Sequence, residues 1–176
     1  PSGTSEAVPF QITPRPVTVS GITAGDKTYD GNTIATLNYD GVTFTGKLKG
    51  DSLTVEATGT FADANAAGNK TVNISGLTLG GDSKDNYVLA TDGQQATATA
   101  TITSKSLSGD DITVTATNPT YNGAQQSPTV AVTYGEITLV ENTDYTLTGN
   151  AETNAGSYTL TVTGKGNYSG DTTKDW

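Results

Sequence analysis

The 176-residue sequence predicts an all-β protein, on three observations. Apolar residues alternate with threonine in several short segments, Asp-Gly and Asn-Gly pairs separate these segments, and a series of landmarks occurs twice at a nearly constant offset. Alternation with period two is the pattern of a half-buried strand, and Asp-Gly or Asn-Gly suits the positive φ angles of tight turns. We therefore expect many short strands joined by turns, as in sandwiches and small barrels.

The alternation is clearest in three segments, 111–117, 128–134 and 157–164, where apolar side chains take one face and mostly Thr takes the other. Further candidate strands are 16–22, 51–61, 70–79, 86–90 and 95–104. Thr is β-branched and suits a pleated strand. Segment 61–70 is Ala-rich but short and contains Gly68, so we expect at most one helical turn there.

Composition excludes several function classes. The chain has no Cys and no His, so a Ser-His-Asp triad, a Cys-His pair, an ordinary zinc site and disulfides are all ruled out. Its formal net charge of −9 opposes binding to nucleic acid and to acidic membrane surfaces, and limits self-association. No apolar run is long enough for a membrane span. We expect a monomer with no cofactor, no nucleic-acid partner and no membrane insertion.

The internal repeat sets the expected domain organisation. Thr28-Tyr29-Asp30-Gly31 corresponds to Thr120-Tyr121-Asn122-Gly123, and the landmarks that follow recur in the same order. Segment 65–76 pairs with 154–164, and 85–88 pairs with 166–169. A period near 90 residues indicates two small domains, each with its own core. We expect modules at 12–104 and 105–176, with 1–11 as a linker or the tail of a preceding repeat.

The motifs also resemble known repeat families. Segment 27–33 (KTYDGNT), followed by Ala67-Gly68, Asp85-Asn86-Tyr87 and a Thr/Ala-rich strand, resembles the YDG-type repeat of bacterial surface proteins. The later segments 121–123, 141–147 and 154–170 resemble the MBG-type, or bacterial Ig-like, repeat. The resemblance implies Ig-like β-sandwich modules arranged end to end, which serve as stalks or spacers in large secreted or cell-surface adhesin-like proteins. It implies no catalytic residues and no ligand.

The Tyr-Asp-Gly and Tyr-Asn-Gly motifs could form a ligand loop or a hairpin turn beside a core tyrosine. We favour the turn, because Asp30 and Asn122 share backbone preferences but not charge, and we expect Tyr29 and Tyr121 to point into their cores. The Asn-Tyr pairs at 86–87 and 167–168 have the same interpretation, with a buried Tyr whose hydroxyl bonds to backbone.

Acidic clusters suggest calcium only weakly. They are Asp82, Asp85 and Asn86 in one loop and Asp110 and Asp111 in another, and neither has the ordered ligand spacing of a calcium loop. No catalytic carboxylate pair is expected, because the acidic residues fall at turns. We assign no catalytic, metal or cofactor-binding residue, and the sequence identifies no ligand-binding residue.

Proteins of the resembled type sometimes carry a Lys–Asn cross-link beside an acidic residue, and Lys27, Lys70 and Lys105 lie in or near predicted strands. Solvated lysines are the expected state. The leading expectation is a non-catalytic spacer of an extracellular bacterial surface protein, whose partners are the neighbouring repeats of the same chain. Two alternatives remain: a binding module for a host glycan or protein, and a β-grasp-like fold, which would need one helix in each module.

Overall fold

The computed structural model describes residues 10–176, which form strands β1 to β18 and one 3-10 helix, η1 (Lys84–Asn86). The predicted all-β class is confirmed. The expected tail at 1–11 lies almost entirely outside the described residues. No helix in the described part is long and apolar enough to cross a membrane. Because η1 has only three residues, the described residues lack the helices that a β-grasp-like module would need.

The structure divides into two compact units. The first unit comprises the chain up to Gly25, Ala35–Thr60 and Thr71–Thr99, and the second comprises Asp26–Ile34, Phe61–Lys70 and Ala100–Trp176. The second unit therefore combines the C-terminal part of the chain with two short segments from the N-terminal part. The module boundaries expected from the sequence, 12–104 and 105–176, stay a prediction.

Two small sheets belong to the first unit. Strand β1 (Arg15–Ser20) pairs antiparallel with β6 (Thr43–Thr45) and parallel with β9 (Tyr87–Leu89). Strand β2 (Thr23–Ala24) pairs antiparallel with β5 (Leu37–Asn38).

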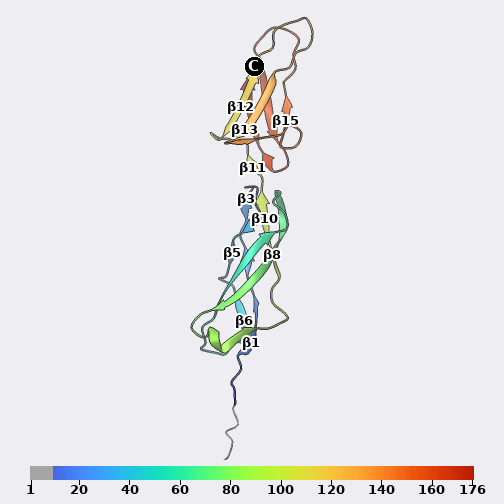
Figure 1. Cartoon of the computed structure of the whole chain (residues 1–176). Helices are drawn as coiled ribbons and strands as arrows, with labels where there is room; N and C mark the ends of the chain where they lie inside the picture. The colour runs from blue at the N-terminus through green and yellow to red at the C-terminus, as the bar shows by residue number, and fades with distance from the viewer. Residues whose placement is uncertain (1–9) are drawn as a thin grey trace, which may run out of the picture. The chain divides into compact units, whose positions relative to one another are not determined.

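A five-stranded sheet has the order β3-β10-β8-β7-β4. Its strands are β3 (Lys27–Thr28), β10 (Thr97–Thr103), β8 (Ala67–Gly80), β7 (Thr54–Phe61) and β4 (Ile34–Ala35) (Figure 1). The edge strand β3 runs parallel to β10. Thus the chain segment that carries the Tyr-Asp-Gly motif leaves the sheet directly after β3.

The strands of the second unit's C-terminal part form three sheets. The first sheet contains β12 (Ile112–Thr117), β13 (Thr129–Tyr134) and β14 (Ile137–Thr138), and the second contains β15 (Tyr145–Thr148), β16 (Thr159–Gly164) and β18 (Asp171–Asp175). The third consists of β11 (Lys105–Ser106) and β17 (Tyr168–Ser169). Figure 1 shows β12 and β13 side by side, and their antiparallel register runs from Ile112↔Tyr134 to Thr117↔Thr129.

Each unit has a cluster of buried apolar side chains. The cluster of the first unit consists of Val19, Ile22, Val55 and Ile74. That of the second unit consists of Leu107, Val132, Leu139, Tyr145, Leu160, Val162 and Tyr168. The cluster residues that lie within strands, such as Val55, Val132 and Leu160, occupy the inward phase, as period-two alternation requires. Ile22, Leu107 and Leu139 lie next to a strand end. Burial of this surface, together with the sheet hydrogen bonds, stabilises a chain that has no disulfide.

All eight predicted strands exist, with ends that differ by up to three residues from the expected ones. Segment 61–70 contains no helix, in agreement with the expectation. Apart from β9, the sequence did not predict the short strands of two to four residues, because strands of that length show little periodicity. The strands not predicted are β2, β3, β4, β5, β6, β11, β14, β15 and β17. The sequence of residues 172–176 resembles the start of a strand, and β18 (Asp171–Asp175) lies there.

Candidate functional site

Tyr29 lies in the second unit, where its half-buried ring packs against the apolar cluster that includes Leu107 and Tyr168. The ring centroids of Tyr29 and Tyr168 are 5.7 Å apart, with the planes at 74°. The expectation of an inward-pointing Tyr29 is correct, although the cluster it joins is made by residues from 107 onward. Tyr121 is 63% exposed, so the expectation that it points into a core is wrong.

The Asp-Gly and Asn-Gly steps form the same local turn. The Asp30 Oδ1 accepts a hydrogen bond from Asn32 N–H, and the Asn122 Oδ1 accepts one from Ala124 N–H. A carboxylate and an amide both supply this oxygen, which explains why either residue occupies the position. The turn at Asp30 does not close a hairpin, because the flanking strands β3 and β4 are not neighbours in their sheet.

Lys27 closes the Tyr-Asp-Gly loop. Its Nζ donates to Asp30 Oδ1 at 2.8 Å, to Asn32 Oδ1 at 2.9 Å and to the Asn32 carbonyl at 2.8 Å. The hydrogen bond from Lys27 holds the pKa of Asp30 below its usual value. These three bonds match the three donors of an ammonium group.

Lys70 is buried, with 8% of its surface exposed, which differs from the solvated state expected for a strand lysine. Its Nζ lies 2.7 Å from Asp63 Oδ1, and this hydrogen bond lowers the pKa of Asp63. Asp63 is 54% exposed, so the pair keeps one end in water. The sequence could have indicated the burial of Lys70, because Lys70 lies on the same face of β8 as the buried Val72 and Ile74.

Lys105 lies against an aromatic ring. Its Nζ is 4.0 Å from the centroid of Tyr134, which is cation–π geometry. All three lysines that the sequence suggested for a cross-link therefore have specific partners: Lys27 and Lys70 each pair with an aspartate, and Lys105 with a ring.

Asn167 bridges to the loop before β8. Its Nδ2 donates to Asn65 Oδ1 at 3.1 Å, and its Oδ1 accepts from Ala66 N–H at 2.7 Å. The next residue, Tyr168, is buried and begins β17, which pairs in parallel with β11 through Lys105. The Asn-Tyr motif thus joins two distant segments of the second unit with hydrogen bonds and aromatic packing.

The second unit carries a groove of about 410 Å³. We call it the Tyr121 groove, and its aromatic and charged lining residues are Tyr121, Tyr158, Trp176, Glu152 and Asp175. The rings of Tyr158 and Trp176 pack with centroids 5.5 Å apart. A pair of backbone hydrogen bonds between Gln126 and Glu152 fixes one side of the groove.

The first unit carries a groove of about 390 Å³, which we call the Tyr87 groove. Arg15, Asp51, Asn86 and Tyr87 are among its lining residues. The Tyr87 hydroxyl accepts a hydrogen bond from Leu48 N–H at 3.0 Å and donates to Asp51, which raises the pKa of the phenol. The predicted bond from this tyrosine to backbone is confirmed.

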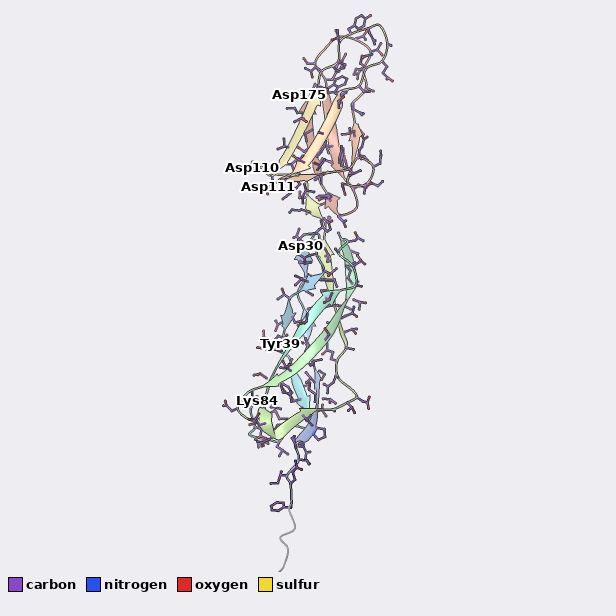
Figure 2. The ribbon with its side chains drawn as sticks, viewed as in Figure 1. Asp30, Tyr39, Lys84, Asp110, Asp111 and Asp175 are labelled. Carbon is purple, nitrogen blue, oxygen red and sulfur yellow. The ribbon has the colours of Figure 1, made fainter. Side chains whose placement is uncertain are left out.

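The acidic clusters do not converge. Among the described residues, no group of three His, Cys, Asp or Glu side chains is placed to hold a metal ion. Figure 2 shows Asp110 and Asp111 together near the start of β12, while Asp175, at the end of β18 in another sheet, lies away from them. Asp111 accepts a hydrogen bond from the Tyr134 hydroxyl at 3.3 Å. Asp85 and Asn86 lie in η1 and line the Tyr87 groove.

Residues 13–94 match the family model of the YDG domain, which confirms the YDG-type resemblance for that segment. No curated protein and no solved structure matches this chain. The matched segment includes the Tyr29 loop, Lys70 and the Asn86-Tyr87 pair. The sequence did not indicate the two grooves.

Proposed function

We propose that this chain is a pair of non-catalytic spacer modules from a large secreted or cell-surface bacterial protein of the adhesin-like kind. In this proposal, residues 105–176 form an MBG-type, Ig-like module that follows the YDG-type module. The modules hold a distal domain away from the surface, and their partners are neighbouring repeats. The environment is extracellular.

The observation that carries the proposal is the joint formed by Tyr29, Asn65, Asn167 and Tyr168. Residues from the YDG-matched segment and from the following segment contribute to one apolar cluster, and the Asn167 side chain makes two hydrogen bonds between the segments, one to the Asn65 side chain and one to the Ala66 backbone. Such a joint suits a spacer, because it couples consecutive repeats at each junction. The charge of −9 fits a module that stays soluble at high local density.

Surface display tests the proposal. One, two or three copies of the chain are placed between a cell-wall anchor and a reporter domain, and capture of a bulky reporter ligand is measured. We expect capture to rise with copy number and to exceed that of a Gly/Ser linker of equal residue count, because flexible linkers gain reach only with the square root of length. Equal capture with the Gly/Ser linkers would reject the spacer function.

A second candidate function is binding of a host glycan or protein. The Tyr121 groove favours it, because aromatic rings beside carboxylates and amides can pack on and hydrogen-bond a sugar. A glycan array probed with the wild-type chain and with Tyr121→Ala tests this function. Binding at micromolar strength that Tyr121→Ala abolishes would place it ahead of the spacer.

A further inference from the structure

Two strand pairs show that the Asn-Tyr motif is used twice in the same way. Strand β1 runs parallel to β9 with Arg15 opposite Tyr87, and β11 runs parallel to β17 with Lys105 opposite Tyr168. In both pairs a basic residue faces the motif tyrosine, and the tyrosine is 6% exposed. The Asn86-Tyr87 end of the first unit is therefore the structural counterpart of the Asn167-Tyr168 end.

The segments that receive Asn167 and Tyr168 also have counterparts in the sequence. Segment 62–65 (ADAN) corresponds to 151–154 (AETN), which continues the alignment of 65–76 with 154–164. In this alignment Asp63 corresponds to Glu152, Asn65 to Asn154 and Lys70 to Tyr158. Tyr29 corresponds to Tyr121 through the Tyr-Asp-Gly and Tyr-Asn-Gly motifs. All four counterparts line the Tyr121 groove.

We infer that the Tyr121 groove is a docking site for the Asn-Tyr end of another module of this kind. The inference rests on the proposed function, since it names the contact by which further repeats would join. The joint in this chain has two sides, the Tyr29 and Asn65 side and the Asn167-Tyr168 side. The Tyr121 groove is the unoccupied counterpart of the first side, and the Tyr87 groove with Asn86 is the unoccupied counterpart of the second. A head-to-tail contact of this type is heterologous and extends without closing.

Tyr121 changes most on docking. Its counterpart Tyr29 is half-buried against Tyr168, whereas Tyr121 is 63% exposed. In the docked state the ring of Tyr121 lies against the Asn86 end of the incoming module, and the exposed Asn86 bridges to Asn154 as Asn167 does to Asn65. A tyrosine at the centre of a contact is a common source of binding energy.

Charge does not drive the docking. Glu152 and Asp175 line one groove and Asp51 and Asp85 line the other, against a single arginine, Arg15. Aromatic packing and amide hydrogen bonds must therefore outweigh a net repulsion. Salt screens such repulsion, so the docked population is expected to increase between low and physiological ionic strength.

A tandem fusion tests the inference at high effective concentration. In this fusion, Gln11 of a second copy follows Trp176 of the first copy directly. Because the chain has no cysteine, Asn154→Cys in copy one and Asn86→Cys in copy two form a single pair for a short thiol cross-linker. The single chain with Asn65→Cys and Asn167→Cys is the reference, because it loses the same kind of hydrogen bond.

We expect the fusion pair to cross-link at a rate within about threefold of the reference rate. Tyr121→Ala in copy one should slow this cross-linking about tenfold, whereas Tyr121→Phe should leave the rate unchanged. The matched control replaces Asn86→Cys by Asn73→Cys, an exposed position on β8. A fusion pair that cross-links only at the control rate overturns the inference. So does a glycan bound at the Tyr121 groove that leaves the fusion undocked.

The test is separate from that of the spacer function. A fusion that extends the reach of a displayed reporter but cross-links at the control rate removes the docking inference alone. A fusion that docks but gives no more reach than a Gly/Ser linker removes the spacer function and leaves the docking site in place.

Discussion

The ring of Tyr29 lies edge-to-face against the ring of Tyr168, with centroids 5.7 Å apart and planes at 74°. This geometry sets the positive edge of one ring on the negative face of the other. Tyr168 is 6% exposed, and burial raises the pKa of its phenol. The contact connects the Tyr-Asp-Gly loop to the apolar cluster of the second unit, which makes Tyr29 a structural residue of that unit.

Tyr29→Ala is expected to lower the free energy of unfolding of the second unit by about 2 kcal/mol, from lost burial and the lost ring pair. Tyr121→Ala is the matched control. Because Tyr121 is largely exposed, its loss should change the free energy by less than about 0.5 kcal/mol. Urea unfolding followed by the fluorescence of Trp176 measures both. Equal losses in the two variants would contradict the different positions of the two tyrosines.

Asn167→Ala should weaken the joint at one identifiable amide. The change removes the acceptor of Ala66 N–H and the donor to Asn65, and an unpaired half-buried N–H costs about 1–3 kcal/mol. Hydrogen exchange at the Ala66 amide should accelerate accordingly. Asn167→Asp keeps the acceptor, so exchange at Ala66 should stay near the wild-type rate.

A double-mutant cycle with Asn65→Ala isolates the bond between the two amides. We expect a coupling of about 0.5–1.5 kcal/mol, the usual net contribution of one hydrogen bond. Strict additivity of Asn65→Ala and Asn167→Ala would show that this bond does not contribute to stability.

The Lys70–Asp63 pair should give the second unit an acid-sensitive component of stability. The hydrogen bond from Lys70 lowers the pKa of Asp63 in the folded state. A lowered carboxyl pKa stabilises the fold above its unfolded value of about 3.9, and that stability is lost as pH falls through the folded value. Urea unfolding between pH 2.5 and 7 should therefore show a decline below about pH 4.

Asp63→Asn should reduce that decline and leave the buried Lys70 ammonium without its carboxylate, which destabilises the unit at neutral pH. Lys70→Met combined with Asp63→Asn should recover part of this loss. Asp30, whose pKa is also lowered, retains its own share of the acid sensitivity. An unchanged pH profile in Asp63→Asn would show that the pair is not part of the acid response.

Periodicity predicted strands that contribute to the core, because half-buried and exposed residues alternate in β12 and because β16 buries Leu160 and Val162 on one face. It could not predict β3, whose position depends on parallel pairing with β10 and not on its own two residues. The turn at Asp30 was predictable from its side-chain oxygen. The burial of Tyr29 against Tyr168 was not, because it depends on which distant segments meet.

The two grooves could not be predicted from the sequence for the same reason. The resemblance between Tyr29 and Tyr121 led us to expect the same burial at both positions. The structure separates them, because Tyr168 covers Tyr29 and no described residue covers Tyr121 in that way. Repetition in the sequence therefore predicts equivalent local geometry, whereas burial depends on what the equivalent surface meets.

Tyr39→Phe should destabilise the first unit. The Tyr39 hydroxyl accepts from Ala57 N–H at 2.9 Å and donates to the Ala57 carbonyl at 3.0 Å, so it completes the hydrogen bonds of one residue of β7. Removing the hydroxyl leaves both groups of Ala57 without that partner in a partly buried position, at a cost of about 1–3 kcal/mol. Amide exchange at Ala57 and thermal unfolding by circular dichroism measure the effect.

Tyr134→Phe is the control, because its hydroxyl makes a longer, exposed contact of 3.3 Å with Asp111 and should contribute less than about 0.5 kcal/mol. If Tyr39→Phe were as mild as Tyr134→Phe, water would have to satisfy Ala57 as well as the phenol does.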